Sequence, residues 1–166
     1  ACSDLPNLNR KAGFVMSDTF SMSPQKRDLV WEAREALRGH VRCAVVDAAG
    51  ELHTSVERGV RPMLLWLRDD PDMLRGATVA DKVVGRAAAL LAIYGGASHV
   101  YGDIMSESAV REFDRAGVRH SATLVTEGIM NRRGDGICPM ERLCAGASSP
   151  EEAYLRMRKK VLEDEQ

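Results

Sequence analysis

The amino-acid sequence predicts an α/β protein with a mixed central β-sheet and helices on both of its faces. Strand-like segments alternate with segments that carry apolar residues at helical spacing, in the order helix, hairpin, helix, strand, helix, strand, helix. This alternation is typical of a layer of strands covered by helices. The chain has 166 residues, of which 45% are hydrophobic and 28% charged, so it can bury a core without metal or disulfide cross-links.

The N-terminal half begins with an irregular segment and continues into the predicted domain. Residues 1–22 show no hydrophobic periodicity and are interpreted as a tail, and residues 23–166 as one domain. Ser23 and Pro24 are typical of a helix start, with serine as the N-cap and proline at the first helical position. The other elements expected in this half are a β-hairpin over residues 41–58 and a short helix over residues 62–67.

The C-terminal half contains the pattern that most resembles a long helix, over residues 79–94. Six apolar residues recur there on one helical face, and Gly95 with Gly96 follows as a stop signal. The other predicted elements are strands over 98–104 and 118–125, helices over 106–116 and 139–144, and a last helix that begins at Ser149-Pro150 with Glu152 in a capping box.

Charge and composition argue against several classes of partner. The 23 basic and 24 acidic residues give a net charge of −1, so we expect neither a nucleic acid nor a membrane as partner. No apolar run reaches the roughly 20 residues of a membrane span, and the expected location is the cytoplasm. No metal or other cofactor is predicted, because the cysteines and histidines do not have metal-ligand spacing. These residues are Cys2, Cys43, Cys138, Cys144, His40, His53, His99 and His120.

Three stretches together resemble the domain-of-unknown-function family 1893. They are "VADKVVGRAAALLAIYGG" at 79–96, "VYGDIMSESAV" at 100–110 and "NRRGDGICPME" at 131–141, and the resemblance extends over residues 41–154. That family is similar to proteins with the cytidine-deaminase-like fold. The resemblance therefore implies a three-layer arrangement in which helices lie on both sides of a mixed sheet. It does not imply an activity, because a fold does not determine a function.

The residues that zinc deaminases require are absent from this sequence. Those enzymes use a His or Cys ligand two residues before a catalytic Glu at one helix start, and P-C-x-x-C at the next. Here the first place is occupied by Asp81-Lys82-Val83 and the second by Met105-Ser106-Glu107-Ser108. We therefore expect no zinc-dependent deamination.

The segment from Asp81 to Arg86 is the first candidate for ligand binding. Asp81 fits a capping box with Thr78, which is a purely structural role. Lys82 and Arg86 would share one helical face, where like charges repel each other, with Gly85 between them. Either Gly85 allows close packing and both cations are solvated, or an anionic ligand binds at this helix start.

The second candidate is the stretch from Asn131 to Cys144. Cys138 precedes Pro139 and would be the N-cap of a short helix, with Glu141 reaching back to the cap amide. A thiol at such a position can be reactive, although a small buried cysteine is the structural alternative. Asn131, Arg132 and Arg133 could bind a phosphate or carboxylate, or belong to a solvated loop.

These candidates lead to three hypotheses. In the first, a small anionic, nucleotide-like ligand binds between two helix starts, at Asp81-Lys82 and Ser106-Glu107, a geometry that the resemblance implies. In the second, Cys138 serves a cysteine-dependent transferase or redox enzyme. In the third, the chain is a structural or interaction module that assembles as a homo-oligomer through its N-terminal segment and last helix. The predicted ligand-binding residues are Asp81, Lys82, Gly85, Arg86, Ser106, Glu107, Asn131, Arg132 and Glu141.

Overall fold

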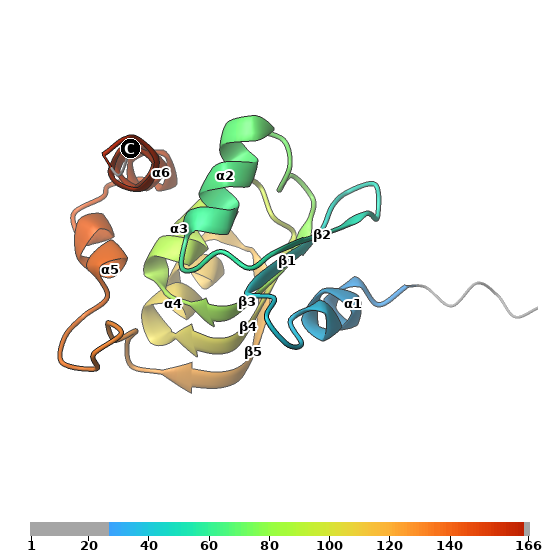
Figure 1. Ribbon diagram of the computed structural model, residues 1–166, viewed down its shortest axis with the longest axis horizontal. Helices are drawn as coiled ribbons and strands as arrows, with labels where there is room; N and C mark the ends of the chain where they lie inside the picture. Colours follow the sequence, from blue (N-terminus) through green and yellow to red (C-terminus); the bar gives the residue numbers. More distant parts are fainter. Residues whose placement is uncertain (1–26, 165–166) are drawn as a thin grey trace, which may run out of the picture.

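The computed structural model describes residues 27–164 and contains a five-stranded mixed sheet (Figure 1). The strand order is β2-β1-β3-β4-β5. Strand β1 pairs antiparallel with β2 and β3, whereas β3, β4 and β5 run parallel. The elements are α1 (Leu29–Ala36), β1 (Cys43–Val46), β2 (Leu52–Ser55), α2 (Arg61–Asp69), β3 (Thr78–Val84), α3 (Arg86–Tyr94), β4 (His99–Ser106), α4 (Glu107–Ala116), β5 (Arg119–Thr126), α5 (Pro139–Cys144), α6 (Pro150–Arg158) and the π-helical turn η1 (Lys159–Glu163).

Helices cover both faces of the sheet, but unequally. Helix α1 packs on one face, where it contacts β1, β3 and β4 around Ala80 and Tyr101. The larger core lies on the other face, which is covered by α3 and α4 with α2, α5 and α6 around them (Figure 1). The predicted α/β class with a mixed sheet and helices on both faces is therefore confirmed.

Most of the predicted elements are present. The hairpin forms from β1 and β2, and β4 and β5 follow the predicted strands closely. Ser106 caps α4 by accepting a hydrogen bond from the amide of Ala109 at 3.1 Å, and Gly117 ends this helix with φ 69°. Ser149 caps α6 in the same way, through the amide of Glu152 at 3.1 Å. Local cap and turn chemistry thus places these boundaries correctly.

The helix predicted over residues 79–94 is wrong in its first half. Residues 78–84 form the central strand β3, and α3 begins only at Arg86. Val79 faces the larger core while its neighbour Ala80 faces α1, so both sides of this strand are buried. Val79 and Val83 are four residues apart, which fits a helix face, and periodicity alone does not separate a short segment buried on both faces from a buried helix. Asp81 therefore caps no helix.

The start of the first helix differs from the prediction as well. Ser23 and Pro24 lie outside the described residues, and α1 begins at Leu29. Its N-cap is Asp28, whose side chain accepts a hydrogen bond from the amide of Trp31 at 3.0 Å. Within residues 27–164, no helix combines the length and the apolar character needed to cross a membrane.

Candidate functional site

A pocket of about 910 Å³ opens beside the end of β3, and we name it the arginine pocket. Its lining comes from the connection between β2 and α2 with the first residue of α2, from the loop after β5 and from the start of α5. Val83 of β3 and Val161 of η1 complete it. Its lining residues are Val56, Glu57, Arg58, Gly59, Val60, Arg61, Val83, Met130, Asn131, Arg132, Arg133, Cys138, Pro139, Met140 and Val161.

The lining combines apolar walls with an excess of positive charge. Four arginines and a single acid, Glu57, lie around the pocket. Arg61 forms an ion pair with Glu57 at 3.3 Å and donates to the carbonyl of Val161 at 3.4 Å. Among residues 27–164, neither hydrogen bonds nor ion pairs engage the side chains of Arg58, Arg132 and Arg133. The pocket therefore offers three available guanidinium groups beside an apolar surface.

The loop that carries two of these arginines is held by its own hydrogen bonds. Met130 and Ile137 form an isolated antiparallel bridge. Asn131 binds Asp135 through its side chain at 2.7 Å and the carbonyl of Gly136 through its amide at 2.8 Å. Gly134 adopts φ 73°, the left-handed conformation that a glycine favours in such a turn. Both the side chain and the backbone amide of Asn131 thus hold the loop that carries Arg132 and Arg133.

The structure brings together only some of the residues predicted to bind a ligand. Asn131, Arg132 and Cys138 line the arginine pocket, and Cys138 is the N-cap of α5 as predicted. The remaining predicted residues are absent from this lining: Asp81, Lys82, Gly85, Arg86, Ser106, Glu107 and Glu141. The four predicted residues of the 81–86 segment therefore do not share a cavity with the 131–138 stretch, and only Val83 of that segment lines the arginine pocket.

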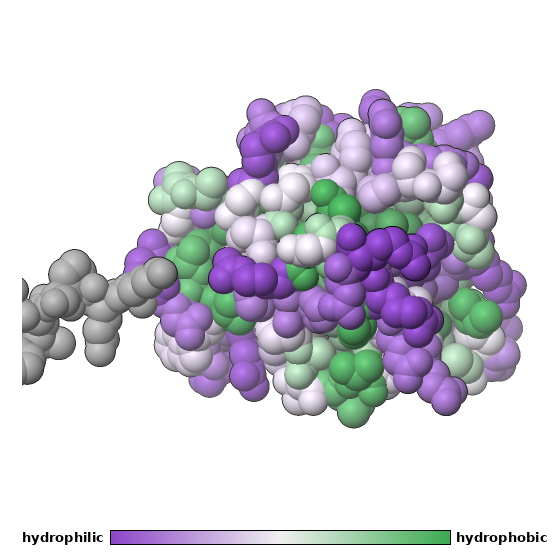
Figure 2. All heavy atoms as spheres, turned by 180° about the vertical axis from the view of Figure 1, so that it is seen from behind, coloured by the Kyte–Doolittle hydropathy of each residue, from purple (hydrophilic) through white to green (hydrophobic). Residues whose placement is uncertain are grey.

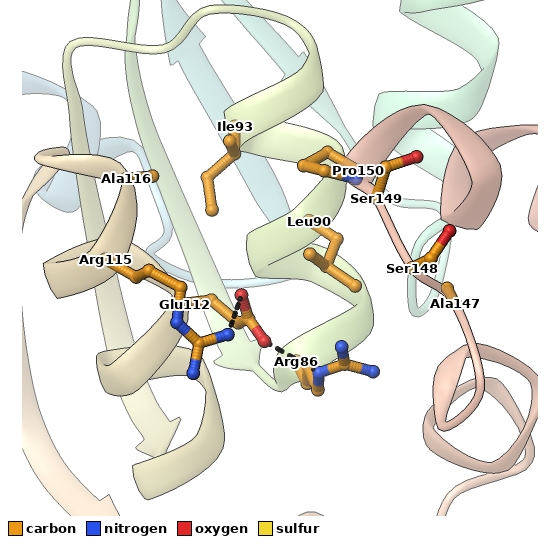
Figure 3. A pocket seen from close by; sticks show the side chains of 10 residues that line it. All are labelled: Arg86, Leu90, Ile93, Glu112, Arg115, Ala116, Ala147, Ser148, Ser149 and Pro150. Atoms are coloured by element: carbon orange, nitrogen blue, oxygen red, sulfur yellow. Dashed lines mark hydrogen bonds and ion pairs between the residues drawn. The ribbon is translucent and has the colours of Figure 1, made fainter.

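Arg86 lies instead beside a smaller pocket of about 300 Å³ (Figure 3). Its Nε donates to Oε1 of Glu112 at 2.9 Å, and its Nη1 donates to the carbonyl oxygen of Cys144. Arg115 adds a second contact to Glu112 at 3.5 Å. Arg86 thus joins α3 to α4 and to the end of α5, which is a structural role in the described chain.

Glu141 has an unexpected role at the beginning of α3. Its carboxylate accepts hydrogen bonds from the amides of Arg86 at 3.1 Å and Ala87 at 2.9 Å. The prediction that it reaches back to its own helix cap is therefore wrong. A Cβ on Gly85 would lie 2.5 Å from Oε1 of Glu141, so a glycine is needed for this approach. The anion-binding position at the start of α3 is occupied by a side chain of the protein itself.

The other predicted ligand-binding residues also have structural partners. Lys82 donates to the carbonyl of Gly39 at 2.9 Å, between α1 and β1. Ser106 is fully buried as the cap of α4, and Glu107 forms an exposed ion pair with Arg111 at 3.7 Å. Neither Lys82 nor the start of α4 therefore lines the arginine pocket.

Asp81 is a buried carboxyl group in the centre of the sheet. It lies opposite Cys43 across the paired strands, and it accepts a hydrogen bond from the amide of Val83 at 3.1 Å. Burial raises the pKa of Asp81 to about 7. Burial and the nearby Asp81 also raise the pKa of the Cys43 thiol well above its ordinary value.

Stability should therefore depend on the protonation of Asp81. Its pKa is higher in the folded than in the unfolded chain, so the stability provided by the protonated form is complete below about pH 3.8 and is lost as the pH rises through about 7. We expect the free energy of unfolding of Asp81→Asn, taken relative to that of the wild type, to be roughly 1–3 kcal/mol higher at about pH 8 than at about pH 5. Urea unfolding at both values measures this. The same difference in the free energy of unfolding at both pH values would refute it.

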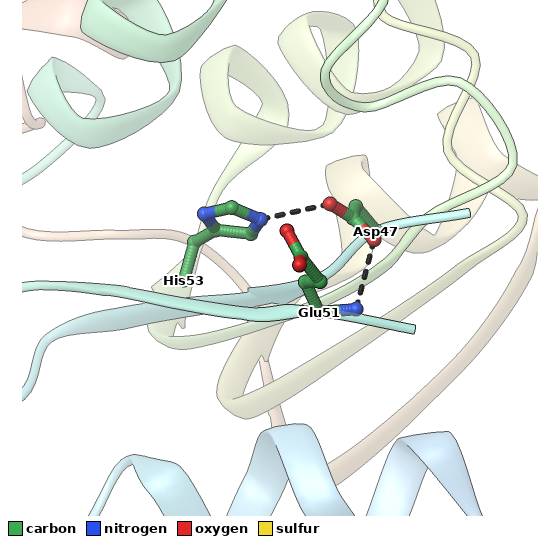
Figure 4. Close-up of side chains that lie close together, drawn as sticks. All are labelled: Asp47, Glu51 and His53. Atoms are coloured by element: carbon green, nitrogen blue, oxygen red, sulfur yellow. Dashed lines mark hydrogen bonds and ion pairs between the residues drawn. The ribbon is translucent and has the colours of Figure 1, made fainter. Parts of the chain in front are cut away.

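The turn of the β-hairpin brings three potential metal ligands together (Figure 4). Asp47 accepts hydrogen bonds from the amides of Ala49 and Glu51, each at 2.9 Å, and Oδ2 of Asp47 lies 2.8 Å from Nε2 of His53. The contact with His53 is the main reason that the pKa of Asp47 is lowered. These hydrogen bonds explain why the three side chains lie together in the hairpin turn, and we assign no metal ion to them.

Sequence reasoning did not identify half of the arginine pocket. Arg58 precedes α2 and Arg61 is its first residue, while Val56 and Met130 supply apolar wall from the β2–α2 connection and from the loop after β5. The only local signal was a pair of arginines three positions apart, ahead of Pro62. Nothing in the sequence indicates that this segment lies against residues 130–133, because the contact depends on how β3 and the last helix are placed.

The fold and the pocket define an α/β protein with a mixed sheet and an arginine-lined hollow beside the end of its central strand. The family model described as a domain of unknown function, DUF1893, matches residues 32–161, so the chain belongs to this family, as the resemblance implied. The crystal structure of a DUF1893 family protein from Thermotoga maritima has the same fold. The TM-score is 0.71 at 23% identity, over 81% of this chain and 91% of that one. A search among curated proteins finds no match.

Proposed function

We propose that the protein binds a small anionic, nucleotide-like ligand in the arginine pocket. The observation that carries the proposal is the set of three available guanidinium groups, Arg58, Arg132 and Arg133, beside an apolar wall. Guanidinium groups bind phosphate and carboxylate oxygens in pairs of hydrogen bonds. A volume of about 910 Å³ lies within the usual range for small-molecule sites.

The lining also indicates how such a ligand would be oriented. Val56, Val83 and Met130 are exposed apolar side chains of the pocket, and they would contact a planar or aliphatic body. The arginines of the 130–137 loop would bind the anionic end. A ligand with both parts uses the whole pocket, so a nucleotide should bind more tightly than either its nucleoside or inorganic phosphate.

Thermal-shift titrations with nucleotides, nucleosides and inorganic phosphate test this proposal. We expect Arg58→Ala combined with Arg132→Ala to weaken nucleotide binding roughly 10–100-fold, because charge-assisted hydrogen bonds are lost. Arg75→Ala is the matched control, since Arg75 is exposed and lies outside the pocket lining. Equal affinity in the double variant and the control would contradict the proposal, as would the absence of any saturable shift in the wild type.

Cys138 provides an independent measurement of the same site. Cys43 and Cys144 are fully buried, so alkylation of a Cys2→Ser variant should report on Cys138. A nucleotide bound in the arginine pocket should slow this alkylation. Among the described residues that line the pocket none is a histidine, so the lining favours binding over catalysis by the thiol.

The finer fold assignment is part of this proposal. The mixed sheet and the helix starts after β3 and β4 support a cytidine-deaminase-like arrangement. At these two starts lie Gly85-Arg86-Ala87 and Ser106-Glu107-Ser108, which contain neither a cysteine nor a histidine. Residue chemistry at both turns therefore supports a function other than zinc-dependent deamination.

A further inference from the structure

One edge of the sheet has the features of a surface that pairs with another strand. Strand β5 bonds only to β4, and no other element within residues 27–164 pairs with its outer edge. It has eight residues, and its register with β4 is constant from His99–Arg119 to Ser106–Thr126, so no bulge bends it. The opposite edge strand, β2, has only four residues.

The side chains of β5 do not protect this edge. Soluble proteins usually block an edge strand with proline, with lysine or other charges, with a bulge, or by making it short. From residue 120 to residue 126 the strand reads HSATLVT, without an acid, lysine, arginine or proline. Leu124 is 53% exposed and Val125 is 51% exposed, although they are neighbours that point to opposite faces. Figure 2 shows a hydrophobic patch at the lower edge of the molecule, where Figure 1 places β5.

The charges at the two ends of the strand indicate what covers it. Arg119 opens β5, and Glu127 follows directly after its last residue. Both are exposed, and within the described chain neither side chain forms a hydrogen bond or an ion pair. In a two-fold antiparallel pair, each end of one strand lies beside the opposite end of the other. A second copy of the same strand would therefore place each Arg119 beside a Glu127.

We propose that two copies of this chain pair through β5, antiparallel and about a two-fold axis, to form one continuous sheet. The register that joins Arg119 to Glu127 of the other copy places Thr123 opposite Thr123 at the axis. It also places Leu124 opposite the smaller Ala122 and Val125 opposite Ser121, so large and small side chains alternate across the pair. The partner is a second copy because the strand is complementary to itself in both charge and size.

Light scattering coupled to size-exclusion chromatography tests the assembly with the full 166-residue chain. We expect a dimer, with twice the 18.2 kDa mass of one chain. Leu124→Lys should weaken the dimer at least about tenfold, because each substitution acts twice at the axis. Leu155→Lys is the matched control, since Leu155 is 54% exposed on α6. Circular dichroism confirms that both variants are folded. A monomeric wild type, or a dimer that Leu124→Lys leaves intact, overturns the proposal.

The register has its own tests. Arg119→Glu should weaken the dimer by opposing two acids at each end, and Arg119→Glu with Glu127→Arg should restore it. In a Cys2→Ser, Cys138→Ser background, Thr123→Cys should form an intermolecular disulfide on mild oxidation, because residues directly opposite lie about 4.5–5.5 Å apart. Leu155→Cys should not. Failure of the charge reversal to restore the dimer, together with failure of the Thr123→Cys cross-link, overturns this register.

Discussion

Replacing Arg86 with alanine is expected to lower the free energy of unfolding by about 2–4 kcal/mol. The side chains of Arg86 and Glu112 are only 23% and 13% exposed, so removing the cation leaves a largely buried carboxylate. Arg115 compensates for part of this charge, but its own side chain is 73% exposed. The substitution also leaves the Cys144 carbonyl without the guanidinium that now donates to it. Both losses fall on the contact between α3, α4 and α5.

Urea unfolding of Arg86→Ala and of Arg111→Ala measures this effect. Arg111 forms an exposed ion pair with Glu107 at 3.7 Å, so its loss should cost well under about 1 kcal/mol. Similar unfolding midpoints for the two variants would show that Arg86 is not a structural link. Below its melting temperature, Arg86→Ala should retain the nucleotide affinity of the wild type, because Arg86 does not line the arginine pocket.

The second large effect is expected at Glu141. Glu141→Ala removes the acceptor for two amides in the first turn of α3 and should cost about 2–3 kcal/mol. Glu141→Gln keeps one acceptor oxygen and should cost less. Glu151→Ala serves as the control, because Glu151 is exposed in the first turn of α6. Thermal or urea unfolding gives all three values.

A double-mutant cycle tests whether position 85 needs a glycine because the Glu141 carboxylate lies against it. Gly85→Ala should be destabilising in the wild type, where the new Cβ meets the Glu141 carboxylate, and milder in Glu141→Ala. Ile129 lies 3.0 Å from the same position, so part of the cost should persist. Additive effects of the two substitutions would contradict the proposed contact, and a loss below about 0.5 kcal/mol for Glu141→Ala would contradict the capping role itself.

Features encoded by adjacent residues were predicted well from the sequence. Ser106 before α4, Ser149 before α6, Cys138-Pro139 before α5 and Gly117 after α4 act through their immediate neighbours, so their side chains or conformations suffice to indicate a boundary. The strand–helix order depends on these boundaries. The order of strands and helices therefore predicted the fold class correctly, even though strand β3 was assigned to a helix.

Features that depend on distant contacts were not predictable in the same way. Val79 and Val83 have helical spacing, but β1 and β4 on either side make residues 78–84 a strand. That change separates Lys82 from Arg86, which would have shared a helical face. The local pattern assigned Glu141 to its own helix, yet it caps a helix that begins 55 residues earlier. Arg58 became a candidate only when the fold placed its loop beside Arg132.

The long-range contact of Glu141 has a consequence for the order of folding events. It lies 54 residues after Ala87, so the first turn of α3 must rely on water for its amides until a long loop has closed. The chain that closes this loop includes residues 130–138, which also form one wall of the arginine pocket. Docking of α5 therefore completes the start of α3 and the pocket wall together, and we expect this step to occur late in folding. Mutations at this contact should increase the unfolding rate more than they decrease the folding rate.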